Sequence, residues 1–282
     1  QRGLRYALLF SGLAGVVAVI CGIYFVASKS STTVCVFHSL LNCNDTPATY
    51  QFNLEFYADR LTGFFLILTG GLNIAAVLHM AGWLPGQHDR NRIASTYNLF
   101  MLFILLALAA NTVYFYILFL EGITLTFAYL ALYRHNLAIE NGPVPTYTPG
   151  APGAGSMVES AKAAFKVYLI FEHVGMMCLT TALLILSSNG FSFNQFRLLS
   201  RAGGELSDST ARLAFLLALI GLGIKAGIFP AHVWVPMVHP YSPTSIHAIM
   251  SGIVLKVAGI YGMYRFFFEF LPVNEWWWGV VV

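Results

Sequence analysis

The sequence predicts an all-α membrane protein, built as a polytopic bundle of helices. The composition supports this fold class, because the 282 residues are 57% hydrophobic and only 10% charged. The mean hydropathy is +0.70. Soluble domains carry about 25% charged residues. Apolar runs of about 20 residues, the length of a helix that crosses a bilayer, recur along the chain. The net charge of +3 indicates no nucleic-acid partner.

The apolar runs predict six or seven membrane spans. The third and fourth runs are expected to be separate helices joined by a tight turn at Ala110–Asn111, because one continuous helix would be far too long for a bilayer. The predicted spans are 4–27, 59–83, 96–110, 112–133, 164–188, 213–238 and 245–268.

These spans make residues 1–282 a single transmembrane domain. The segment 141–157, NGPVPTYTPGAPGAGSM, is predicted to be a flexible loop rich in Pro and Gly, because it offers little apolar surface to bury. The chain begins without Met and ends in EWWWGVVV, so we interpret it as a fragment.

The four cysteines divide into two kinds. Cys21 and Cys178 lie in apolar segments and are expected to be small packing residues. Cys35 and Cys43 share one loop. A slight excess of Lys and Arg on the N-terminal side favours a cytoplasmic N-terminus. This orientation puts the loop outside, where the redox environment allows a disulfide between Cys35 and Cys43. No spacing typical of a metal site is present.

The stretch GLGIKAGIFPAHVWVPMVHP (221–240) places a charge and helix breakers inside an apolar span. Pro230 removes a backbone hydrogen bond and is predicted to break the helix. A broken helix in lipid is tolerated where it lines a polar cavity or is buried in protein. We therefore expect Lys225 to face a pocket of free carbonyls and water. A lysine desolvated there can gain and lose a proton near neutral pH.

Charged side chains within spans cost roughly 2.5–3.5 kcal/mol each on insertion scales, so each needs a reason. Glu121 lies near the middle of the fourth span and Lys225 near the middle of the sixth. We expect these two to pair, and a movable carboxylate beside Lys225 would act as a proton switch. The alternative is a permanent ion pair that fixes helix packing.

Three histidines lie between Lys225 and a second lysine within a span, Lys256. Histidine changes its charge near neutral pH, so the cluster predicts a proton relay towards Lys256. Each ring taken singly is equally well explained as a structural histidine. Metal binding is a weaker alternative, because the spacing is not that of a helical ligand pair. The three are His232, His239 and His247.

The fifth span carries secondary candidates. Glu172 and His173 are adjacent in KVYLIFEHVG, and Lys166 begins the same stretch. Lys166 either extends to the membrane surface or contributes to the electrostatics of the Glu121–Lys225 pair.

At these residues the sequence resembles a known family. GIKAGIFPAHVWVPMVHPYSPTSIHAIMSGIVLKVAGIYGMYR resembles the core signature of antiporter-like subunits. Such subunits occur in respiratory complex I, Mrp-type cation/proton antiporters and group 4 membrane-bound [NiFe] hydrogenases, including formate hydrogenlyase. The pattern K-A-G-x-x-P-x-H-x-W-x-P-x-x-H-P looks most like the hydrogenase-linked branch. ANTVYFYILFLEGITLTFAYL and KVYLIFEHVG are similar to the fourth-to-fifth and sixth helices of the family.

The resemblance implies a fold and a set of roles. The spans would be helices two to eight of the family, forming the first repeat of an inverted-repeat fold. Glu121 matches the glutamate of the fifth helix, and Lys225 matches the lysine of the broken seventh helix. Lys256 matches an eighth-helix lysine that leads onward, and Lys166 is close to a sixth-helix lysine seen in part of the family.

The resemblance further implies a proton-translocating subunit of a redox-driven complex, of the complex I or group 4 hydrogenase type. Other membrane subunits and a peripheral redox arm would be partners, in a bacterial or archaeal cytoplasmic membrane. We expect no cofactor in this chain, and iron–sulfur clusters with [NiFe] or quinone in partner subunits. Four alternatives stay open: an Mrp-type Na⁺/H⁺ antiporter subunit without a redox partner, the membrane subunit of an ion-coupled uptake complex, a solute transporter with broken helices, and a non-conducting scaffold.

Overall fold

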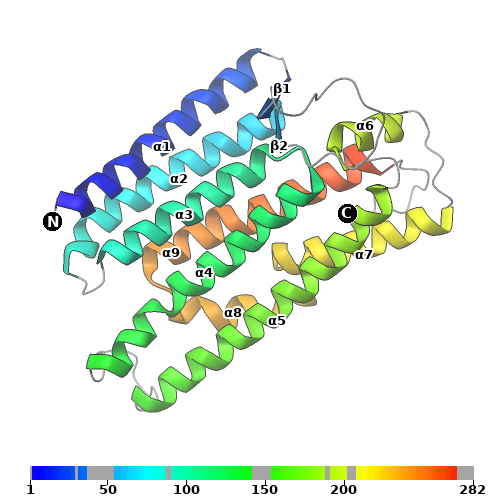
Figure 1. Ribbon diagram of the computed structural model, residues 1–282. Helices are drawn as coiled ribbons and strands as arrows, with labels where there is room; N and C mark the ends of the chain where they lie inside the picture. The colour runs from blue at the N-terminus through cyan, green and yellow to red at the C-terminus, as the bar shows by residue number, and fades with distance from the viewer. Residues whose placement is uncertain are drawn as a thin grey trace.

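The computed structural model describes residues 2–28, 31–36, 54–86, 90–141, 154–187, 191–201 and 208–271. Helices that lie side by side dominate it (Figure 1). The elements in chain order are α1 (Arg2–Ser28), β1 (Thr32–Val36), β2 (Leu54–Ala58), α2 (Arg60–Trp83), η1 (Leu84–Gly86), α3 (Arg90–Ala109), α4 (Val113–Asn141), α5 (Ala154–Leu186), α6 (Phe193–Arg201), α7 (Asp208–Ala226), η3 (Ala231–Val233), α8 (Trp234–Val238), η4 (His239–Tyr241), α9 (Thr244–Ile249), η5 (Met250–Tyr261), α10 (Gly262–Tyr264) and η6 (Arg265–Phe270).

Seven helical segments among the described residues are long and apolar enough to cross a membrane, which confirms the predicted fold class. The predicted turn between the third and fourth spans is also present, because α3 ends at Ala109 and α4 begins at Val113. Both helices extend beyond the predicted apolar runs, since polar residues can continue a helix outside the hydrocarbon region. Asn141 still belongs to α4 and Ala154 already belongs to α5, while residues 142–153 lie outside the described part.

A short antiparallel hairpin, which the sequence did not predict, follows α1. Strand β1 pairs with β2, with Thr32 opposite Ala58 and Val36 opposite Leu54. The hairpin lies at the end of α1 and α2 opposite the N-terminus (Figure 1), and we call this end of the bundle the hairpin end. The backbone of Cys35 belongs to β1, but Cys43 lies outside the described residues, so the disulfide stays a prediction.

Glycines bring α5 and α7 into direct backbone contact. A Cβ atom added at Gly221 would lie 2.6 Å from the carbonyl oxygen of Gly175 and 2.8 Å from the backbone nitrogen of Leu179. Small residues of this kind allow helices in a membrane to approach closely. The contact lies about one turn from the ionisable residues of both helices, so it sets how far apart their side chains are.

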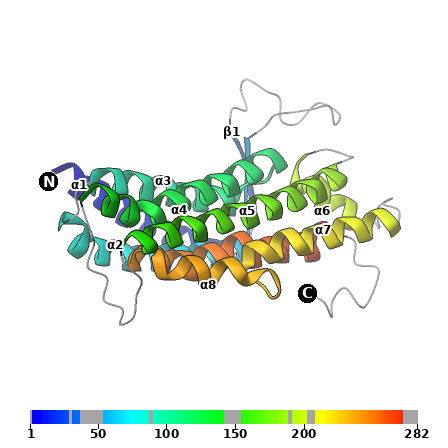
Figure 2. The same ribbon diagram turned by 90° about the horizontal axis from the view of Figure 1, so that it is seen from below.

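The sixth span is broken, as predicted, but the break begins earlier than Pro230. Helix α7 ends at Ala226, and Gly227 adopts a φ of 67°, which favours glycine over residues with a Cβ. After the irregular segment the chain continues through η3, α8 and η4 along the edge of the bundle (Figure 2). The carbonyl of Ile224 accepts the backbone N–H of Gly227 at 3.1 Å and the indole Nε1 of Trp234 at 3.0 Å, so Trp234 anchors the segment after the break to the end of α7.

The last span packs on this break and has unusual helical geometry. Its hydrogen bonding is that of a π-helix over η5 and η6, with the short α10 between them. Gly259 of η5 lies directly against Ala226, the last residue of α7. Wide helical turns of this kind occur often at functional sites. The element that carries Lys256 therefore packs against the element that carries Lys225.

Candidate functional site

Lys225 is buried in an ion pair with Glu172 rather than with Glu121. The Nζ atom lies 2.8 Å from Glu172 Oε2, and the two residues are 2% and 5% exposed. The predicted Glu121–Lys225 contact is therefore wrong. The physical reason is the packing of helices: the close contact of Gly175 with Gly221 brings α5, which carries Glu172, directly against α7.

A further hydrogen bond supports the carboxylate of Glu172. The hydroxyl of Thr124 on α4 lies 3.3 Å from Glu172 Oε2 and 3.2 Å from the carbonyl of Leu120. Tyr168 donates to the carbonyl of Thr124 at 3.4 Å and is also buried. Truncating one partner of a buried pair costs about 3–5 kcal/mol, because the other charge is left uncompensated. The pair thus holds α4, α5 and α7 together and keeps two opposite charges within the span.

Glu121 forms a second pair, with His173 of α5. Its Oε1 atom lies 2.9 Å from His173 Nε2, and the two side chains are 28% and 50% exposed. Glu172 and His173 are consecutive residues, so their side chains point in directions about 100° apart on the helix. As a result, α5 carries one ionisable residue towards α7 and the next towards α4.

The histidines of the broken segment form a connected group with Lys256. The rings of His239 and His247 are 4.1 Å apart, and His247 Nδ1 donates to the backbone carbonyl of His239 at 3.2 Å. His239 Nε2 lies 3.5 Å from the hydroxyl of Ser251. Lys256 Nζ donates to the carbonyl of Ser251 at 2.7 Å. The structure thus brings together two of the three predicted histidines and the second lysine.

The two remaining candidates lie apart from this group. His232 contacts Phe229, with ring centroids 5.6 Å apart, and its buried Nδ1 has no hydrogen-bond partner among the described residues. Lys166 is exposed on α5, as expected for a lysine that extends to the membrane surface.

Sequence reasoning missed a polar cluster at the hairpin end. Arg265 is buried and donates to Asp59 Oδ2 at 2.7 Å and to Glu269. Arg197 of α6 donates to Glu269 Oε2 at 2.8 Å and to Asn111 Oδ1 at 3.0 Å. The sequence contained one signal for this cluster, the Arg265 and Glu269 pair spaced one helical turn apart.

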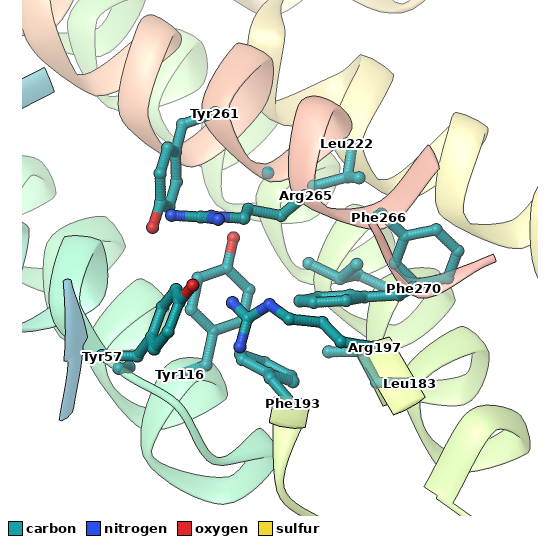
Figure 3. Close-up of a pocket in the computed structure, with 13 residues that line it drawn as sticks. Tyr57, Tyr116, Leu183, Phe193, Arg197, Leu222, Tyr261, Arg265, Phe266 and Phe270 are labelled. Atoms are coloured by element: carbon teal, nitrogen blue, oxygen red, sulfur yellow. The ribbon is translucent and has the colours of Figure 1, made fainter. Parts of the chain in front are cut away.

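This cluster borders a small aromatic cavity. Figure 3 shows the side chains of Arg197 and Arg265 lying among the rings of Tyr57, Tyr116 and Tyr261. The cavity has a volume of about 20 Å³, which is enough for one water molecule. The cluster therefore closes the bundle at this end with ion pairs and little room for solvent.

Asp59 precedes the second span and begins α2 as its N-cap. Its side chain accepts the backbone N–H of Thr62 at 2.9 Å. Burial alone would raise the pKa of this carboxyl, but the hydrogen bonds and charge of Arg265, together with the bond from Thr62, outweigh burial and lower the pKa. Asp59 is thus held as a carboxylate beside Arg265.

Among the described residues, no group of three or more His, Cys, Asp or Glu side chains is placed to hold a metal ion. The chemistry that the arrangement offers is proton exchange within a span, because its groups are carboxylates, lysines and imidazoles.

The fold is that of an antiporter-like membrane subunit. Residues 137–282 match the profile of the family described as NADH:quinone oxidoreductase/Mrp antiporter, transmembrane. The match covers about half of the chain, and the chain therefore belongs to this family.

Particular relatives come from several kinds of complex. The chain is 25% identical to hydrogenase-4 component B of Escherichia coli, over 99% of this chain and 37% of that protein. The fold is similar to a chain of the membrane-bound sulfane sulfur reductase, an archaeal respiratory complex, with a TM-score of 0.75 and 15% identity. It is also similar to a chain of the Mrp complex from Dietzia sp. DQ12-45-1b, with a TM-score of 0.73 and 19% identity. Each likeness covers 99% of this chain, but only 50% and 46% of the two solved chains.

Proposed function

We propose that this chain translocates protons as a membrane subunit of a redox-driven complex. The observation that carries the proposal is the Glu172–Lys225 pair, buried within a span next to a broken helix. Ionisable residues inside a membrane are costly, and they mark ion and proton pathways by default. A lysine is suited to this role because its ammonium loses a proton more readily than a guanidinium does.

The proposed path has a switch and a relay. Lys225 is held in the protonated form by Glu172, and a change of charge or distance at Glu172 releases its proton. Water is the proposed acceptor of the proton, because a broken helix in a membrane is tolerated where it lines a polar cavity. His239 and His247 then pass it towards Lys256, because His239 contacts the hydroxyl of Ser251 and Lys256 donates to the backbone carbonyl of the same residue. His232, with its unpartnered Nδ1, is the candidate residue at the entrance of the relay.

The redox part of the proposal concerns partner subunits. The likeness to hydrogenase-4 component B supports a complex of the hydrogenase or complex I type, with other membrane subunits and a peripheral redox arm. Iron–sulfur clusters with [NiFe] or quinone would belong to that arm, and the complex would lie in a bacterial or archaeal cytoplasmic membrane. The second candidate is an Mrp-type Na⁺/H⁺ antiporter subunit without a redox arm, which the similar fold of an Mrp chain favours.

The test is proton transport by the complete complex in sealed vesicles, with Lys225→Arg as the principal variant. Arginine keeps the positive charge beside Glu172 but cannot give up its proton in a protein. We expect assembly to be retained and proton transport to be lost. Lys166→Arg is the matched control, because Lys166 is exposed on the neighbouring helix.

Unchanged transport in Lys225→Arg would refute the proton switch and leave a structural ion pair. The same vesicles separate the two candidate functions. Proton transport that needs an electron donor supports the redox-driven complex. Transport that needs sodium and no electron donor supports the Mrp-type antiporter.

A further inference from the structure

The contact between Glu121 and His173 has a donor and acceptor pattern that fixes one hydrogen. His173 Nδ1 lies 2.7 Å from the backbone carbonyl of Leu169. A carbonyl oxygen can only accept, so Nδ1 carries a hydrogen. Turning the ring over would place carbon atoms against both oxygens and lose both hydrogen bonds. Nε2 is then the atom that faces Glu121.

A second hydrogen must lie between Nε2 and Glu121 Oε1. The two atoms are 2.9 Å apart, which is a hydrogen-bonding distance. Without a hydrogen between them, a lone pair of the imidazole would face a carboxylate oxygen. Two arrangements supply it: an imidazolium beside a carboxylate, or a neutral imidazole that accepts from a carboxylic acid. Either way, the pair holds one exchangeable proton.

The other oxygen of Glu121 distinguishes these arrangements. Oε2 is buried and has no hydrogen-bond partner among the described residues. An unpaired carbonyl oxygen of a neutral acid costs less free energy than an unpaired oxygen that shares a negative charge. Glu172 differs in this respect. Its Oε2 accepts hydrogen bonds from Lys225 Nζ and Thr124 Oγ1, which stabilise the carboxylate form.

The neighbouring ion pair adds no net charge that would favour the ionic form. Glu172 and Lys225 balance each other's charge. Tyr168 of α5 also lies close to Glu121. On the side of α3, the ring of Phe103 lies against Gly122, which is an apolar contact. In a span, desolvation favours the neutral form of an acid and of an imidazole.

We propose that Glu121 and His173 form a neutral dyad that stores one proton, held on Glu121 Oε1 and donated to His173 Nε2. Release would break the Glu121 O–H bond, leave a carboxylate and pass the proton to a water molecule. The neighbouring Glu172–Lys225 pair is ionic, so α5 carries two pairs of different character. The inference concerns proton occupancy at rest and does not require transport through Lys225.

The test is infrared spectroscopy of the complete complex in membranes, in H₂O and in D₂O. We expect a carboxylic-acid C=O band that shifts in D₂O and is lost in Glu121→Gln. Glu172→Gln is the matched control and should leave the band in place, because Glu172 is a carboxylate. In His173→Phe the acid loses its acceptor, so the band should move to higher wavenumber.

Identical spectra of the wild type and Glu121→Gln in the carboxylic-acid region would overturn the neutral dyad. A measurement on the unmodified chain keeps the inference testable if a variant does not assemble. Nitrogen-15 solid-state NMR of His173 should give the neutral form with hydrogen on Nδ1. A ring protonated on both nitrogens would overturn the proposal in favour of the ionic pair.

Discussion

Replacing Gly221 by alanine should separate the two helices that carry the Glu172–Lys225 pair. The new Cβ would lie 2.6 Å from the carbonyl oxygen of Gly175, whereas ordinary contacts begin at 3.4 Å. The helices must therefore move apart by the difference, about 0.8 Å. A rigid movement of that size would lengthen the 2.8 Å ion pair to about 3.6 Å, beyond hydrogen-bonding distance.

The expected cost in stability is about 1–3 kcal/mol, the usual penalty for overpacking. Thermal unfolding of the purified complex measures this cost, and proton transport in vesicles measures the effect on the pair. Gly223→Ala is a close control on the same helix, because a Cβ there meets nothing within 4 Å. If Gly221→Ala is as stable and as active as Gly223→Ala, then the glycine contact does not set the geometry of the pair.

Two further predictions concern other contacts of the bundle. Thr124→Val removes one hydrogen bond to Glu172 and should cost about 1 kcal/mol in thermal unfolding, with Lys225 still paired; a loss of assembly would contradict this. Asp59→Asn should cost about 1–2 kcal/mol, because Arg265 loses a charged but partly exposed partner. The lowered pKa of Asp59 means that its contribution is full above its ordinary value of 3.8 and is lost as the pH falls through the lowered pKa. Unfolding temperatures measured from neutral pH downward should therefore converge for the wild type and Asp59→Asn in acid, and a constant difference would contradict the assignment.

The membrane spans could be predicted from sequence because each is a local feature. An apolar run of about 20 residues needs no knowledge of its neighbours to be recognised as a span. The turn between α3 and α4 followed from the same length argument. The break in the sixth span was also predicted, but its start at Gly227 depends on a left-handed backbone conformation that several glycines in the stretch could have adopted.

The partner of Lys225 could not be predicted, because it depends on which helices touch. Glu121 and Glu172 are both acidic residues within spans, and only the approach of Gly175 to Gly221 selects Glu172. The cluster around Arg265 was missed for a similar reason. The acidic partner Asp59 lies 206 residues away from Arg265 in the sequence.

The consecutive positions of Glu172 and His173 give α5 a mechanical property. Each residue ties the helix to a different neighbour, so the two ties together fix its rotational setting about its own axis. A rotation of α5 about its axis that is large enough to break one of these contacts also distorts the other. The geometries of the two pairs are therefore linked through a single helix. A rotation of α5 caused by a neighbouring protein at either end would therefore change the Glu121–His173 and Glu172–Lys225 pairs together.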